Sequence, residues 1–157
     1  MQRAEHRIRA VDGRLLSVLT VGSPQGDHVF FLHGTPGVRE IYGPHIEEIA
    51  RRGLIYDSYS RPGYGGSDRH PGREIADCAA DIAAIADQIG AETFYLIGES
   101  GGGPHALACA PYCLSEFEAL RSLGRSRLLT LRNLTGKRAW VKATAKSSEQ
   151  RAKGPAR

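Results

Sequence analysis

Apolar residues along this chain occur in short runs separated by turn-forming residues. Residues 7–21 hold two such runs on either side of Asp12-Gly13, where the glycine supplies the positive φ of a tight hairpin turn. Residues 29–32 form a later run that does not alternate with polar residues, which is typical of a strand buried on both faces of a parallel sheet. Residues 54–59 and 93–97 are two further strand candidates. The pattern predicts an antiparallel hairpin followed by three buried parallel strands.

Segments with helical spacing of apolar residues lie between and after these runs. Residues 42–52 form one predicted helix, which ends at Gly53, and residues 73–89 form a longer one, which ends at Gly90. A third predicted helix covers residues 105–110. Strands that alternate with helices favour right-handed crossovers and a mostly parallel sheet with helices on both faces. We therefore predict an α/β fold.

Length and composition exclude several protein classes. With 157 residues, of which 41% are hydrophobic, the chain can form one domain with a core and is neither disordered throughout nor a disulfide scaffold. No apolar run approaches the roughly 18 residues of a membrane span, and no apolar stretch follows the charged start as in a secretory signal. We expect a cytoplasmic protein with no membrane partner. Cys78, Cys109 and Cys113 lack neighbours at ligand spacing, so we expect small buried residues, no metal and no cofactor.

The charge of the chain changes sign near Pro111. The net charge of the whole chain is +4, but residues 1–110 carry ten Arg and 14 acidic residues, whereas residues 111–157 carry 11 basic and three acidic residues. We treat residues 1–110 as part of a domain. Residues 111–157 are a basic tail whose Lys, Arg, Ser and Ala content is typical of disorder.

The sequence Gly98-Glu99-Ser100-Gly101-Gly102 lies between a predicted strand and a predicted helix. In this G-x-S-x-G pattern a nucleophilic serine occupies a tight turn, and the flanking glycines admit neighbouring backbone without a clash. The turn would raise the Ser100 hydroxyl above the sheet edge, at a helix N-terminus that favours negative charge. The alternative is an ordinary Gly/Ser loop, but the preceding buried strand favours the nucleophile.

The segment HGTPG, residues 33–37, directly follows another predicted strand. Acyl transfer needs N–H donors for the oxyanion that forms on the substrate. Pro36 has no N–H, so the Thr35 amide is the candidate donor, together with the Gly101 amide. We expect His33 and Gly34 to support this loop, His33 by hydrogen bonds. The alternative is an ordinary Gly/Pro turn.

Three segments together resemble the α/β-hydrolase fold superfamily, especially serine hydrolases of the proline iminopeptidase and esterase-like type. They are FFLHGTPG, SRPGYGGSD and LIGESGGGPHALACA, in the order and at the separations usual in that family. The resemblance covers residues from about 11 to 110. It implies that Ser100 attacks the carbonyl of a small ester, amide or peptide substrate, and that Thr35 and Gly101 bind the oxyanion. The loop of residues 61–67 looks like a structural loop of the family, so we place no catalytic residue there.

The family's acid and histidine, which follow the serine in that order, are missing from this chain. No Asp follows Ser100; the later acids are Glu116, Glu118 and Glu149. The single later histidine, His105, lies in the predicted helix after the tight turn of Ser100, which is called the nucleophile elbow, and is most simply a packed helix residue. The remaining histidines are expected on loops, edges or surfaces: His6, His28, His45 and His70. The triad acid and base therefore stay unassigned.

The tail does not continue the family's sequence of helices and strands. Back-translation from the third base of the Pro111 codon admits a stop-free reading, LLSERVRSVAIIGSVAPFNAEELDW, which describes a helix end and a strand. We hypothesise that the reading frame shifts near codon 111. Residues 111–157 would then be an out-of-frame or disordered tail, and the hydrolase domain would be truncated after the elbow helix.

Three functional hypotheses follow from these features. The chain is a working serine hydrolase, a catalytically incompetent remnant of one, or a binder of nucleic acid or acidic surfaces through its basic tail. The missing acid and histidine favour the second for this chain. The tail's aromatic residues, Tyr112, Phe117 and Trp140, are not interleaved with its basic residues, which argues against nucleic acid as a partner.

Overall fold

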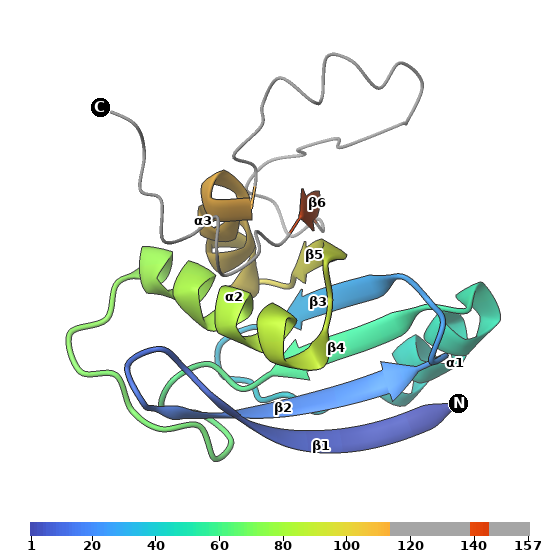
Figure 1. The fold of residues 1–157 in the computed structure, drawn as a ribbon, viewed down its shortest axis with the longest axis horizontal. Coiled ribbons are helices and arrows are strands. Elements are labelled where there is room, and N and C mark those ends of the chain that lie inside the picture. Colours follow the sequence, from blue (N-terminus) through green and yellow to red (C-terminus); the bar gives the residue numbers. More distant parts are fainter. Residues whose placement is uncertain (114–138, 145–157) are drawn as a thin grey trace.

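The computed structural model describes residues 1–113 and 139–144. These residues form a mixed sheet with helices on both faces (Figure 1). The elements in chain order are β1 (Gln2–Arg9), β2 (Leu15–Gly22), β3 (His28–Leu32), α1 (Gly43–Arg52), β4 (Ile55–Tyr59), the 3-10 turn η1 (Ile75–Asp77), α2 (Cys78–Ile89), β5 (Thr93–Gly98), α3 (Gly102–Cys113) and β6 (Ala139–Thr144).

The described strands lie in the order β1-β2-β4-β3-β5-β6. The central strands β4, β3 and β5 are parallel, whereas β1 and β2 form an antiparallel hairpin, and β2–β4 and β5–β6 are also antiparallel. Gly13, with φ of 90°, allows the hairpin turn. The predicted α/β fold, hairpin and three parallel strands are confirmed. The carboxyl ends of β3 and β5 consequently meet at one edge of the sheet.

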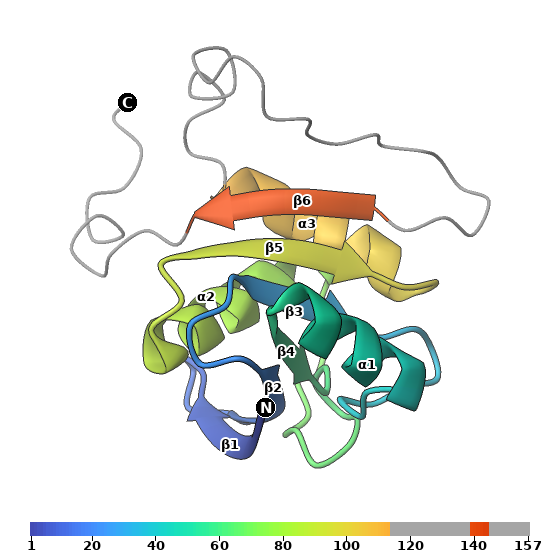
Figure 2. The same ribbon diagram turned by 90° about the vertical axis from the view of Figure 1, so that its right-hand side faces the viewer.

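Alternate residues of β3 enter two separate cores, because successive side chains of a strand point to opposite faces. Phe30 and Leu32 pack with α2 and α3, in the larger cluster of buried residues. Val29 and Phe31 face α1, where Ile49 is the buried helical residue of the smaller cluster. Figure 2 shows α1 on one side of the sheet and α2 on the other. Burial on both faces explains the uninterrupted apolar run of residues 29–32.

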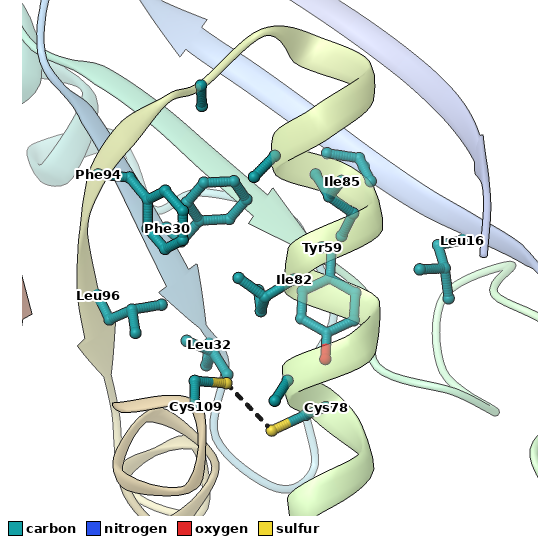
Figure 3. Close-up of a cluster of buried hydrophobic side chains, with 14 of the residues drawn as sticks. Leu16, Phe30, Leu32, Tyr59, Cys78, Ile82, Ile85, Phe94, Leu96 and Cys109 are labelled. Atoms are coloured by element: carbon teal, nitrogen blue, oxygen red, sulfur yellow. Dashed lines mark hydrogen bonds between the residues drawn. The ribbon is translucent and has the colours of Figure 1, made fainter. Parts of the chain in front are cut away.

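The larger cluster joins the sheet to both helices of its face (Figure 3). The rings of Phe30 and Phe94 pack edge to face with centroids 4.6 Å apart. Cys78 of α2 and Cys109 of α3 are buried, and their sulfur atoms lie 3.3 Å apart. Cys78 also contacts the carbonyl oxygen of His105 at 3.3 Å, so α2 packs directly against the helix that follows the elbow.

The helix boundaries differ from the prediction at two places. The helix expected from residue 73 begins at η1, because the side chains of Glu74 and Asp77 cap each other's backbone N–H groups. The helix expected from residue 105 begins at Gly102, since Pro104 is compatible with the first turn, where its missing N–H has no intrahelical partner.

The strand β6 was not predicted, although its residues Trp140, Val141 and Thr144 have high strand propensity. The predicted domain boundary at residue 110 lies inside α3. The expected disorder of the rest of the tail concerns residues 114–138 and 145–157, which lie outside the described part of the chain. No helix in residues 1–113 is long and apolar enough to cross a membrane.

Candidate active site

Ser100 occupies the sharp turn between β5 and α3. Its φ of 47° is the one positive value for a non-glycine residue in the described part of the chain, and its side chain is exposed. A Cβ atom on Gly98 would collide with the Gly102 carbonyl, and one on Gly102 would collide with the Leu32 carbonyl. The glycines of the motif therefore allow a strained serine to stand at the sheet edge while neighbouring backbone passes close by.

The loop after β3 lies directly against this turn. A Cβ atom on Gly34 would lie 3.3 Å from the Ser100 Cβ, and one on Gly101 would lie 3.3 Å from the Thr35 nitrogen. The two predicted oxyanion donors are thus neighbours beside Ser100. Within residues 1–113, neither the Thr35 amide nor the Gly101 amide donates a hydrogen bond to another protein group.

Glu99 ties the turn to β3 through its backbone. Its amide donates to the Leu32 carbonyl at 3.1 Å, and its carbonyl accepts from the Gly102 amide at 2.7 Å. A pocket of about 360 Å³ opens in front of Ser100. It is lined by Phe31, His33, Gly34, Thr35, Pro36, Gly37, Val38, Glu40, Glu99 and Ser100. Both predicted segments therefore share one pocket.

Arg61, the second residue after β4, joins the two segments that line this pocket. The sequence alone did not identify it as a site residue. It is 1% exposed, and its guanidinium donates to the carbonyls of Gly34 and Gly101 and to the Thr35 hydroxyl. The signal available in the sequence was an arginine after a buried strand, at the start of a Gly-rich loop. Because such loops are usually exposed, the sequence does not reveal that this arginine is buried.

His33 supports the loop from inside the protein. Its Nε2 accepts from the Arg61 amide at 3.1 Å, so the neutral ring carries its proton on Nδ1, which donates to the Gly34 carbonyl at 2.7 Å. Burial lowers the pKa of His33 from 6.5 to about 4, and the nearby Arg61 charge acts in the same direction. His33 is therefore neutral at pH 7, and both of its nitrogens are engaged.

His105 is buried beneath the elbow on α3. Its Nδ1 lies 2.8 Å from the Gly101 carbonyl and 3.0 Å from an Arg61 nitrogen, and its Nε2 lies 3.5 Å from an Arg73 nitrogen. Burial lowers its pKa, and the charges of Arg61 and Arg73 lower it further. Neither His33 nor His105 offers an open nitrogen to Ser100.

Two histidines to which the sequence assigned no role lie away from Ser100. The expectation of a loop, edge or surface position is wrong for His28, which is partly buried at the opposite end of the central strand β3, because its Nδ1 lies 2.6 Å from the Oδ2 of the buried Asp57 on the neighbouring strand. His45 lines a second pocket beside α1. Across residues 1–113 and 139–144, no cluster of three His, Cys, Asp or Glu side chains could hold a metal ion.

Comparison with known proteins agrees with this architecture. Residues 27–112 match the family model of the alpha/beta hydrolase fold. The AB hydrolase superfamily protein YisY of Bacillus subtilis is 30% identical over 103 residues, which are 65% of this chain and 38% of that protein.

Solved structures give the same result. An esterase from Exiguobacterium antarcticum aligns with a TM-score of 0.60 and 31% identity, over 68% of this chain and 39% of the esterase. Epoxide hydrolase A from Mycobacterium thermoresistibile aligns with a TM-score of 0.61 and 25% identity, over 69% and 35%. The chain thus spans well under half the length of these relatives. Since the family model covers more than half of the chain, this protein belongs to the α/β-hydrolase fold family.

Proposed function

We propose that Ser100 is the nucleophile of a serine hydrolase site that acts on a small ester, amide or peptide bond by acyl transfer. The observation that carries the proposal is the strained φ of Ser100 beside two amides that have no acceptor in the described part of the chain. Strain of this kind persists where the surrounding structure enforces it, and it is often found at active sites. The similarity to an esterase supports the same class of reaction.

The reaction would follow the chemistry of serine acyl transfer. The Ser100 oxygen forms a bond to the substrate carbonyl carbon, the carbonyl π electrons move onto its oxygen, and the hydroxyl proton passes to a base. The Thr35 and Gly101 amides would donate to the oxyanion, and the N-terminus of α3 would add a favourable dipole. As the intermediate collapses, its bond to the leaving group breaks, the base returns the proton to that group, and the alcohol or amine departs. Water, deprotonated by the same base, then hydrolyses the acyl-enzyme and regenerates the Ser100 hydroxyl.

The base is the part of this machinery that the described residues do not supply. The nitrogens of His33 and His105 are occupied by backbone and arginine partners. We therefore propose that this 157-residue chain is weakly active or inactive, because a protonated serine without a base is a poor nucleophile. In a complete site, the acid and the histidine would come from the part of the family's fold that this chain does not match.

We also propose that a frame shift near codon 111 accounts for the basic tail. Residues 1–110 carry all three family motifs, and the tail carries none. DNA sequencing across codons 105–115 tests this: an alternative frame closed by stop codons would eliminate it. The proposal about Ser100 does not depend on the outcome.

Hydrolysis of p-nitrophenyl acetate and labelling by a fluorophosphonate test the function of Ser100. We expect the 157-residue chain to exceed its Ser100→Ala variant only slightly in hydrolysis, with slow labelling confined to Ser100. A chain restored to the alternative frame should label at Ser100 much faster. Rapid labelling of the 157-residue chain would show that it contains a base, whereas labelling unaffected by Ser100→Ala would overturn the assignment of the nucleophile.

A further inference from the structure

We infer that Arg61 is a positioning residue that orients both oxyanion donors, the Thr35 and Gly101 amides, through one buried guanidinium. The inference rests on the proposed function of the site. Nη2 of Arg61 donates to the Gly34 carbonyl at 3.0 Å and to Thr35 Oγ1 at 2.8 Å. Nη1 donates to the Gly101 carbonyl at 3.1 Å. One planar group therefore binds the loop after β3 and the elbow after β5 together.

The contact with Gly34 acts directly on one oxyanion donor. The Gly34 carbonyl and the Thr35 N–H belong to the same peptide group, which is not a cis bond. In a trans peptide these two groups point in opposite directions. Because Arg61 and His33 both bind the carbonyl, the Thr35 N–H is directed away from them. The cationic donor also polarises the peptide, which makes its N–H a stronger donor.

The contact with Gly101 fixes the second donor. Gly101 directly follows Ser100, and its carbonyl accepts from Arg61 while the Ser100 carbonyl accepts from the Gly103 amide. These two bonds hold the backbone on both sides of the Gly101 amide. The Thr35 side chain lies between the segments, since a Cβ atom on Gly101 would approach Thr35 Oγ1 to 2.9 Å. Movement of Arg61 would therefore disturb both donors at once.

The charge of Arg61 suits this role. In the described part of the chain no carboxylate forms an ion pair with Arg61. Its guanidinium contacts neutral oxygens and the rings of His33 and His105, and its central carbon lies 5.7 Å from the centre of the Tyr64 ring. Burial lowers the pKa of Arg61, but an arginine remains protonated at neutral pH. An uncompensated cation behind the donors favours the negative charge that develops on the substrate oxygen.

Two variants of Arg61 separate the contribution of its charge from that of its planar geometry. Lysine can supply the charge and the length of the side chain, but its single ammonium cannot reproduce the planar fork that meets acceptors on two segments. Arg61→Lys and Arg61→Met therefore test geometry and charge separately. Arg69→Met is the matched control, because Arg69 is an exposed arginine of the same loop.

The first measurement is the rate of Ser100 phosphonylation by a fluorophosphonate, resolved into its maximal rate and its half-saturating concentration. Loss of one oxyanion donor slows a serine enzyme by about 100-fold or more, so we expect Arg61→Met to lower the maximal rate by about 10- to 100-fold. The half-saturating concentration should change little, Arg61→Lys should resemble Arg61→Met, and millimolar methylguanidinium should partly restore the Met variant. Arg69→Met should match the wild type.

The second measurement is independent of activity and uses the amide NMR resonances of Thr35 and Gly101. We expect both resonances to shift in Arg61→Lys and Arg61→Met, and to remain in place in Arg69→Met. The inference would be overturned if neither resonance shifted, or if the same single resonance, that of Thr35 or that of Gly101, shifted in both variants. If neither the 157-residue chain nor the chain restored to the alternative frame labels faster than its Ser100→Ala variant, the proposed function fails, and the resonances still decide the role of Arg61.

Discussion

The two ends of β3 place two histidines in opposite electrostatic surroundings. His28, at the start of the strand, lies 2.6 Å from the carboxyl group of Asp57, which is fully buried and also accepts from the Thr20 hydroxyl at 2.7 Å. His33, just beyond the end of the strand, faces Arg61 and backbone carbonyls. We call the residues around the start of β3 the carboxylate cluster: His28, Asp57 and Thr20.

The difference indicates which end of the sheet can stabilise an oxyanion that develops on a substrate. In the carboxylate cluster, the Asp57 carboxyl group is already bound by His28 and Thr20 inside the protein. At the elbow end Arg61 meets only neutral acceptors within the described residues, and the Thr35 and Gly101 amides stay available. We therefore expect changes in the carboxylate cluster to alter stability, and changes at the elbow end to alter the reactivity of Ser100 as well.

The largest effect on stability is expected from Asp57→Ala. The substitution leaves the Thr20 hydroxyl and the His28 ring without their buried acceptor. Leaving a hydrogen-bonding group without its partner costs about 1–3 kcal/mol, and two groups lose their acceptor here, so we expect a loss of about 3 kcal/mol. Urea unfolding followed by circular dichroism should show this loss in the free energy of unfolding.

Glu48→Ala is the matched control for this prediction. Hydrogen bonds from Arg51 and Arg52 lower the pKa of Glu48 to about 2, but these side chains are exposed on α1. Solvent screens such pairs, so we expect no measurable change in the unfolding midpoint. A loss as large in Glu48→Ala as in Asp57→Ala would contradict the contrast between buried and exposed carboxylates.

The next effect is a loss of stability in acid that originates at His33. Its pKa is about 4 in the folded protein and about 6.5 in the unfolded chain, so between these values the unfolded chain binds the proton first. Stability therefore falls as the pH is lowered from 6.5 to 4, by up to about 3 kcal/mol from this residue. The measurement is the free energy of unfolding across that range.

His33→Gln separates this contribution from other titrating groups. The variant has no ionisable ring, so its free energy of unfolding should depend less steeply on pH between 4 and 6.5 than that of the wild type. His105, whose pKa is also lowered by burial, should contribute with the same sign. Parallel pH profiles of wild type and His33→Gln would show that His33 is not the source.

The sequence predicted the central sheet and the turn of Ser100 because both have local signals. Continuous apolar runs indicate strands buried on two faces, and a G-x-S-x-G after such a run indicates an elbow. The local pattern at Arg61, an arginine at the start of a Gly-rich loop, does not indicate its role, since that role depends on three loops meeting at one sheet edge. The carboxylate cluster was missed for the same reason: Thr20, His28 and Asp57 lie on three different strands and become neighbours only through strand order.

The smallest predicted effect is that of Thr20→Val, within the carboxylate cluster. Valine keeps the β-branched shape that suits a strand, and it removes only the hydroxyl that donates to Asp57 Oδ1 at 2.7 Å. Because Thr20 is only half-buried, water can replace part of this bond, so we expect a loss of about 1 kcal/mol in the free energy of unfolding. Thr20→Ser, which keeps the hydroxyl and loses the methyl group, is the control. If the urea midpoint falls more in Thr20→Val than in Thr20→Ser, with unchanged m-values, the loss is assigned to the hydrogen bond. If it falls more in Thr20→Ser, the loss is assigned to packing of the methyl group.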